Sequence, residues 1–100
     1  MKTEITQTDN TVTVTVCGRL DTVTSAEFEK TLSPYFSSQG LELALDCCEM
    51  EYISSAGLRI ILTAHKSITA NSGRFIIRNT SKEVRSVLEM TGFSRILTIE

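Results

Sequence analysis

Residues 52–62 read Tyr-Ile-Ser-Ser-Ala-Gly-Leu-Arg-Ile-Ile-Leu and join an extended segment to a helix. Ser54 is a natural N-cap, because its hydroxyl can accept a hydrogen bond from an unpaired amide of the first helical turn. From Ser55 onward, apolar residues recur at the spacing of one helical face, and Gly73 is a natural stop. A strand that leads through a short turn into a helix is a building unit of α/β folds.

Upstream of this segment, the clearest strand is the alternation of threonine and valine over residues 11–16. A period of two places the three valines on one face of the strand. Asp9 and Asn10 supply turn residues, so residues 2–8 are expected to form the partner strand of an antiparallel hairpin. Gly18 is expected to end the second strand.

A first helix is expected after this hairpin. Thr24 and Glu27 fit a capping box, in which the Thr24 hydroxyl accepts from the third helical amide and Glu27 reaches back to the Thr24 amide. Val23 and Phe28 sit at the hydrophobic staple positions of the same motif. Pro34 has no amide proton, so the helix is expected to kink or break there.

The remaining elements alternate between strands and helices. Residues 41–45 form a short apolar run that predicts a central strand ending at Asp46. Residues 74–78 predict a further strand, and a second capping box over residues 80–83 predicts a third helix that a glycine ends. Residues 96–99 predict a last short strand.

The order β-β-α-β-α-β-α-β predicts a single α/β domain that spans residues 1–100. Strands linked through helices are parallel, and the N-terminal hairpin is antiparallel, so the sheet is expected to be mixed, with about three helices packed on it. No repeat, linker or low-complexity segment interrupts the chain.

Charge and hydropathy exclude several classes of partner. The formal net charge is −2, so there is no basic field to attract nucleic acid or an anionic membrane. No run approaches the ~20 apolar residues of a membrane span, and residues 1–9 lack the order of a signal peptide. We therefore expect a cytoplasmic protein without membrane insertion.

The cysteines and the single histidine provide no metal site. Cys17, Cys47 and Cys48 form no CxxC motif, and His65 alone cannot complete a zinc constellation. Three reduced thiols are expected, part in the core and part at the surface. A nucleotide-binding module is a further alternative, but no GxxxxGK[ST] or GxGxxG run exists to hold phosphates. No metal and no cofactor are expected.

A small hydrolase or phosphotransferase with Ser55 or Cys47 as nucleophile is one alternative. Such a site needs a general base within reach. His65 lies about three helical turns from Ser55, or ~15 Å along the helix, and is expected to pack at the rim of the core. Carboxylates within residues 46–51 raise a thiol pKa rather than lower it. We therefore expect no enzyme activity.

The turn at Ser54 and Ser55 lies where a parallel strand ends, which is where open α/β sheets place their working crevice. A phosphate on a serine of the first helical turn could accept from the free amides, which the helix dipole favours by about 0.3–1 kcal/mol. The alternative is structural: Ser54 only caps the helix, and Gly57 only permits close packing.

With these residues in view, the chain resembles the STAS-domain family, and closely the anti-sigma-factor antagonists of bacteria. The family's turn runs Asp-Ser-(Ser/Thr)-Gly-Leu, and Gly57 and Leu58 align with its last two residues. The resemblance therefore implies Ser55 as the phosphoacceptor, with Ala56 at the family's second Ser/Thr and Ser54 at its aspartate. A second family mark is Gly-Arg-Leu-Asp over residues 18–21, and Met-Thr-Gly-Phe over residues 90–93 resembles the family's last helix end.

The resemblance implies a partner switch in transcription regulation. The unmodified protein would bind an anti-sigma factor that is also a serine kinase, phosphorylation would release it, and a serine phosphatase would restore it. A phosphoserine adds about −1.5 to −2 charge, next to an expected acidic surround of Asp21, Asp46, Glu49 and Glu51. The residues expected to contact the partner are Asp21, Ser54, Ala56, Gly57, Leu58 and Arg59, with Met50, Tyr52 and Ile53 at the floor or edge of the surface.

Two alternatives stay open within the family. Ser54 stands where the family has aspartate, which creates a second candidate hydroxyl one residue from Ser55. The protein could also be a scaffold that is not phosphorylated, such as the small STAS subunit of a lipid-transport ATPase complex. Arg59 is a candidate contact for an acidic partner or a kinase surface, and the alternative for it is a solvated surface charge.

Overall fold

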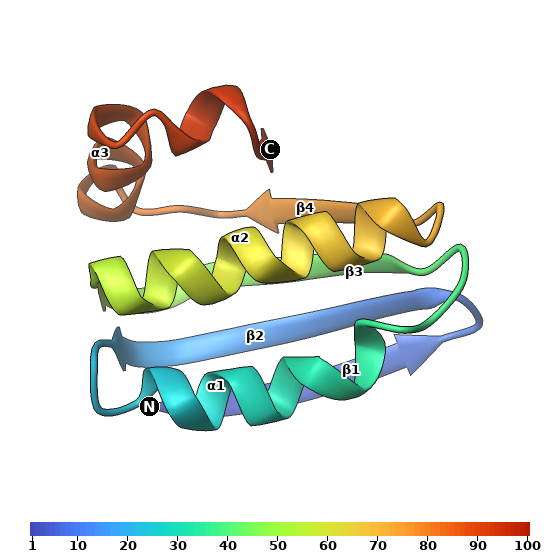
Figure 1. Cartoon of the computed structure of the whole chain (residues 1–100). Coiled ribbons are helices and arrows are strands. Elements are labelled where there is room, and N and C mark those ends of the chain that lie inside the picture. Colours follow the sequence, from blue (N-terminus) through green and yellow to red (C-terminus); the bar gives the residue numbers. More distant parts are fainter.

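The computed structural model describes residues 1–100, and its sheet has the strand order β1-β2-β3-β4-β5 (Figure 1). The first two strands pair antiparallel, and every later neighbouring pair is parallel. The predicted mixed sheet with an N-terminal hairpin is therefore confirmed. The strands are β1 (Lys2–Thr8), β2 (Thr11–Leu20), β3 (Glu42–Ile53), β4 (Arg74–Arg78) and β5 (Thr98–Ile99).

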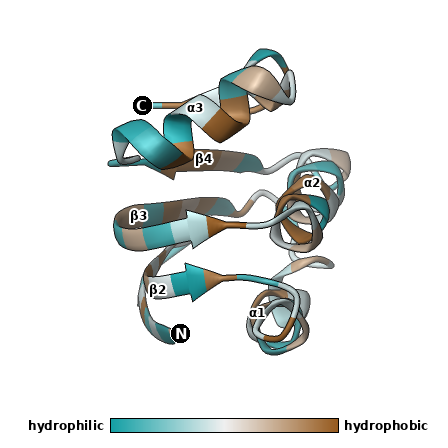
Figure 2. Cartoon of the chain, turned by 90° about the vertical axis from the view of Figure 1, so that its left-hand side faces the viewer, coloured by the Kyte–Doolittle hydropathy of each residue, from teal (hydrophilic) through white to brown (hydrophobic).

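Three α-helices accompany the sheet, as predicted. They are α1 (Ser25–Leu32), α2 (Ser55–Ala70) and α3 (Lys82–Met90). The first two lie side by side on one face, whereas α3 lies apart from that layer and contacts β3 (Figure 2). No helix is long and apolar enough to cross a lipid bilayer.

The core fills the space between the sheet and the α1–α2 layer. The alternating valines of β2 are completely buried, as the period of two predicts. They pack with the apolar face of α2, including Leu58, Ile61 and Ile68, and with Phe28 and Leu32 of α1. This packing holds the beginnings of both helices against the ends of the strands that precede them.

Two predicted strand ends are wrong. β2 continues past Gly18 to Leu20, and β3 continues past Asp46 to Ile53. The pairing of β2 with β3 shifts register between Thr15 and Cys17 and again after Gly18, whose φ is +94°. Each shift inserts an extra residue into β3 and interrupts its alternation of buried and exposed side chains, so the sequence pattern hides the continuation of β3.

The predicted capping box of α1 is also wrong. Thr24 precedes the helix but makes no side-chain cap, and its amide donates to Asp21 instead. Val23 is 86% exposed, so it forms no staple with Phe28. The break at Pro34 is confirmed, because α1 ends at Leu32 and a 3₁₀ turn follows over Ser33–Tyr35.

The other helix ends follow the prediction more closely. Ser54 caps α2 as predicted, but α2 ends at Ala70, and the left-handed residue after it is Ser72 rather than Gly73. The N-cap of α3 is Ser81, one residue after the predicted box begins. After α3, a 3₁₀ turn over Phe93–Arg95 shortens the last strand to two residues.

Candidate functional site

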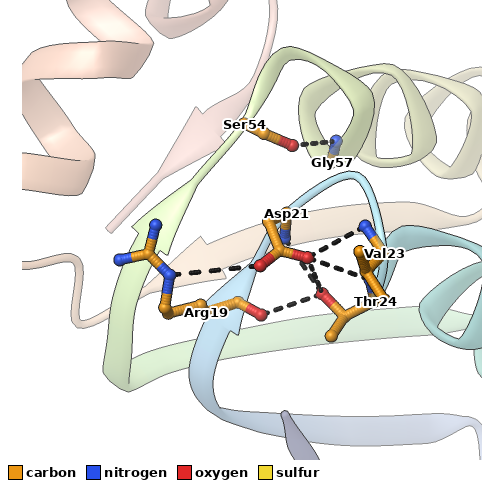
Figure 3. Close-up of polar contacts among 6 residues, drawn as sticks. All are labelled: Arg19, Asp21, Val23, Thr24, Ser54 and Gly57. Carbon is orange, nitrogen blue, oxygen red and sulfur yellow. Dashed lines mark hydrogen bonds and ion pairs between the residues drawn. The ribbon is translucent and has the colours of Figure 1, made fainter.

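The ends of β2 and β3 bring two loops together at one edge of the sheet. Leu20 pairs with Ile53 in the parallel register, and the Ser54 amide donates to the Leu20 carbonyl at 2.8 Å. Asp21 follows directly on β2, and Ser54 follows directly on β3. The Asp21 turn and the first turn of α2 are therefore neighbours, as Figure 3 shows.

Asp21 organises the turn that leads into α1. Its Oδ1 accepts from the amides of Val23 and Thr24, each at 3.0 Å (Figure 3). The Asp21 carbonyl accepts from the Ser25 amide at 2.9 Å. The hydrogen bond from the Thr24 amide is the main cause that lowers the pKa of Asp21 below its ordinary 3.8. The carboxylate is thus a fixed negative charge beside the start of α2.

Thr24 and Arg19 hold the same turn from the other side. The Thr24 hydroxyl accepts from the Asp21 amide at 2.9 Å, and its proton is shared between the Arg19 carbonyl at 2.9 Å and Asp21 Oδ1 at 3.2 Å. The Arg19 guanidinium lies 4.3 Å from the ring centre of Tyr52, and Arg19 Nε is 4.0 Å from Asp21 Oδ2. Sequence reasoning missed Arg19 and Thr24, since their roles depend on the paired register of two strands.

The two serines at the head of α2 have different surroundings. The Ser54 hydroxyl accepts from the Gly57 amide at 3.2 Å, and the Ser54 carbonyl accepts from the Leu58 amide at 2.9 Å. Ser54 is half-buried and engaged in capping. Ser55 is exposed at the first position of the helix, and its hydroxyl makes no hydrogen bond within the chain.

The other residues predicted to contact the partner differ in their exposure to solvent. Gly57 lies against the end of β2, where an added Cβ would stand 2.7 Å from Leu20 Cγ. Leu58 is also buried, Ala56 is half-buried, and Arg59 is exposed and outside every ion pair. Gly57 and Leu58 therefore pack in the interior beneath the turn, while Asp21, Ser55 and Arg59 present polar groups at the surface.

The expected acidic surround is smaller than the sequence suggested. Asp46 precedes Ser54 by eight residues of extended chain, roughly 25 Å, and accepts from Asn79 Nδ2 at 3.2 Å. Glu49 lies on β3 before the second register shift, and its carboxylate accepts a hydrogen bond from the Cys17 thiol. The prediction that both carboxylates surround the turn is wrong, because β3 is long and extended.

Only part of the predicted apolar floor reaches the surface. Met50 and Ile53 are both 3% exposed and belong to the core, whereas Tyr52 is 40% exposed and lies under Arg19. A small hollow of about 40 Å³ lies beside Tyr52, between the end of β3 and α3. Tyr52 is thus the apolar side chain of this run that a partner can touch.

The alternative nucleophile and base are poorly placed for catalysis. Burial is the main cause that raises the pKa of the Cys47 thiol to about 12, so it carries little thiolate near neutral pH. His65 is half-buried with its ring edge-on to Phe75, and its Nδ1 has no hydrogen-bond partner. No group of three or more His, Cys, Asp or Glu side chains has the arrangement of a metal site.

Comparison with known proteins agrees with this architecture. The anti-sigma-B factor antagonist of Listeria monocytogenes is 28% identical over 89 residues, which are 89% of this chain and 78% of that protein. The structure of an anti-sigma factor antagonist from Mycobacterium paratuberculosis has a TM-score of 0.87 at 21% identity, covering 98% of this chain and 83% of that one.

The structure of the Bacillus cell fate determinant SpoIIAA in the phosphorylated form has a TM-score of 0.77 at 19% identity, covering 99% of this chain and 91% of that one. At these identities, the two structures establish the shared fold. The family model of the STAS domain matches residues 2–100. The chain therefore belongs to the STAS domain family.

Proposed function

We propose that this STAS domain is an anti-sigma-factor antagonist that works by partner switching. Unphosphorylated, it binds an anti-sigma factor that is also a serine kinase. Phosphorylation at Ser55 releases it, and a serine phosphatase resets it. The name of the Listeria relative supports the antagonist role, and the phosphorylated SpoIIAA structure supports a phosphate switch in this fold.

The observation that carries the proposal is the contrast between the two serines. The Ser54 hydroxyl is held by the Gly57 amide, whereas the Ser55 hydroxyl is exposed at the helix head. A kinase needs a free hydroxyl that can enter its active site, and Ser55 offers one without disturbing the helix cap. This contrast favours Ser55 over Ser54 as the acceptor.

The switch follows from charge and bulk on this surface. A phosphate on Ser55 adds about −1.5 to −2 charge near the fixed carboxylate of Asp21, so the binding surface becomes strongly acidic. The amides of the first helical turn and the exposed Arg59 favour the phosphate on the free protein. A loss of about 2.7 kcal/mol in binding free energy weakens the complex roughly a hundredfold.

The first experiment measures phosphorylation by intact-mass and peptide mass spectrometry, after incubation with ATP and lysate of the host cell. Ser55→Ala is expected to abolish the phosphate. Ser54→Asp keeps a capping oxygen and restores the family's residue, so it serves as the matched control that should still be phosphorylated. A phosphate retained in Ser55→Ala would contradict the assignment of Ser55.

A second measurement separates the switch from the scaffold alternative. Ser55→Glu is compared with the unmodified protein for binding to a purified anti-sigma kinase of the same host. The proposal expects at least a tenfold weaker complex with Ser55→Glu. Equal binding by both forms, together with no phosphate in any sample, would favour the STAS scaffold that is not phosphorylated.

A further inference from the structure

Two cysteines lie on the sheet face that α1 and α2 leave uncovered. Val16 and Cys47 point into the core, with exposed fractions of 0% and 1%. Their neighbours Cys17 and Cys48 therefore point to the opposite face, where Cys17 is half-buried and Cys48 is exposed. All three cysteines of the chain are free thiols in this structure.

The register of β2 and β3 places these two thiols side by side. Cys17 pairs with Glu49, so Cys48 is displaced by one residue from the position opposite Cys17. A strand spacing of about 4.8 Å and a rise of about 3.3 Å per residue put the two Cα atoms roughly 6 Å apart. Disulfides span about 4.4–6.8 Å between Cα atoms, so this separation lies within the range of a bridge.

The first register shift sets the offset between the two thiols along the strands. Between the pair of Thr15 with Asp46 and the pair of Cys17 with Glu49, β3 contains one more residue than β2. The extra residue leaves Cys48 and Glu49 both exposed, although regular alternation would turn one of them toward the core. Without the bulge, the offset of 31 positions would continue and Cys48 would pair with Cys17 on the same face, so the bulge displaces Cys48 by one residue and adds Glu49 to that face.

A carboxylate is in contact with one of the thiols. The Cys17 thiol donates to Glu49 Oε2 at 2.7 Å, which fixes its Sγ on the β3 side of the strand. Glu49 is thus placed to accept the Cys17 proton when Sγ becomes a nucleophile. The same hydrogen bond is the main cause that raises the pKa of Cys17, and a hydrogen bond with Asp46 is the main cause that raises the pKa of Cys48, so both thiols are mainly protonated near neutral pH.

We propose that Cys17 and Cys48 are an oxidation site that closes into an intramolecular disulfide. The oxidant is a peroxide, which converts the exposed Cys48 thiol to a sulfenic acid and leaves as water. Cys17 Sγ then attacks the Cys48 sulfur, the S–S bond forms, and the S–O bond breaks. The Cys17 proton passes through Glu49 to the departing hydroxide, so two thiols and one peroxide give one disulfide and two waters.

The bridge would tie β2 to β3 just before the strands end in the Asp21 turn and at Ser54. This inference does not rest on the proposed function, because it concerns the thiols and the sheet register alone. A dithiol reductant is expected to reverse it, since thiol–disulfide exchange breaks an accessible bridge.

The test uses the full chain, with Cys47→Ala as the background that removes the third thiol. The protein is treated with hydrogen peroxide, its free thiols are alkylated, and the peptides are mapped by mass spectrometry. The proposal expects a loss of about two mass units, a peptide from residues 3–19 linked to one that contains Cys48, and full recovery with dithiothreitol.

Two single variants provide the controls. Cys17→Ser and Cys48→Ser should each form no intramolecular bridge and keep the far-ultraviolet circular dichroism of the parent. The wild-type chain should give the same linked pair as the Cys47→Ala background. A bridge between Cys47 and Cys48 in the wild type, a bridge only between two molecules, or oxidation to sulfinic acid without any bridge would overturn the proposal.

Discussion

Gly57 is the residue where the packing under the site can be tested most directly. In Gly57→Ala, the new Cβ would lie 2.7 Å from Leu20 Cγ, 2.9 Å from Leu20 Cδ2 and 3.2 Å from the Leu20 carbonyl oxygen. Carbon atoms pack at about 3.5–4.0 Å, so the helix head or the end of β2 must move by nearly 1 Å. Leu20 is completely buried and its carbonyl binds the Ser54 amide, which leaves little room for that movement.

The expected loss in the free energy of unfolding combines two opposed effects. Overpacking a filled core costs about 1–3 kcal/mol, whereas alanine is favoured over glycine within a helix by about 0.8–1.0 kcal/mol. The net loss is therefore about 1 kcal/mol. For a domain of this size, that corresponds to a fall in Tm of about 4–8 °C.

The assay is urea denaturation followed by circular dichroism, with Gly57→Ala measured in the wild-type and the Leu20→Ala backgrounds. Removing the Leu20 side chain removes the two closest contacts, so Gly57→Ala should then be neutral or stabilising. A stabilising effect of Gly57→Ala in the wild type would refute the tight contact. An equal loss in both backgrounds would show that the Leu20 side chain is not its cause.

Three further predictions test the loops. Ser72 adopts φ of +62° and is exposed, so Ser72→Gly should raise the free energy of unfolding by about 0.5 kcal/mol, while Ser72→Ala should not. Asn71 Nδ2 donates to the carbonyls of Phe36 at 2.8 Å and Ser67 at 3.1 Å, so Asn71→Ala should lower the free energy of unfolding by about 1–2 kcal/mol in urea denaturation. The pKa of Asp21 is lowered in the folded state, so its contribution to stability is present above its ordinary 3.8 and is lost as the pH falls through the lower folded value. Carboxyl NMR titration should find that lower midpoint, and Asp21→Asn should flatten the acid side of the curve of stability against pH.

The elements of this fold are predictable where one local signal decides them. The valine alternation of β2 and the Ser54 cap of α2 both rest on residues a few positions apart, and the structure confirms them. The length of β3 cannot be predicted from a local signal, because the buried residues in its second half are Cys47, Met50 and Ile53, which are three positions apart instead of two. That spacing results from the two register shifts in the pairing of β3 with β2, and the sequence of one strand does not reveal its pairing register.

The start of α1 shows a similar limit within the site. Both Asp21 and Thr24 can cap a helix, and the capping box favours Thr24. The Thr24 hydroxyl instead turns back to the Arg19 carbonyl of β2, which leaves the Asp21 carboxylate to receive the free amides. Which of the two residues receives the amides therefore depends on the end of the preceding strand. The contact of Arg19 with Tyr52 on the neighbouring strand depends on it too.

The two register shifts explain why the site exists at this edge. Val12 pairs with Leu43, an offset of 31 positions, whereas Leu20 pairs with Ile53, an offset of 33 positions. Without the two extra residues in β3, Leu20 would oppose residue 51, and Ser54 would lie about 7 Å farther along the strand direction. The Ser54 amide could then not reach the Leu20 carbonyl, and Gly57 would not lie on Leu20. The irregularities that hide β3 from sequence analysis are thus what set the Asp21 turn beside the exposed Ser55.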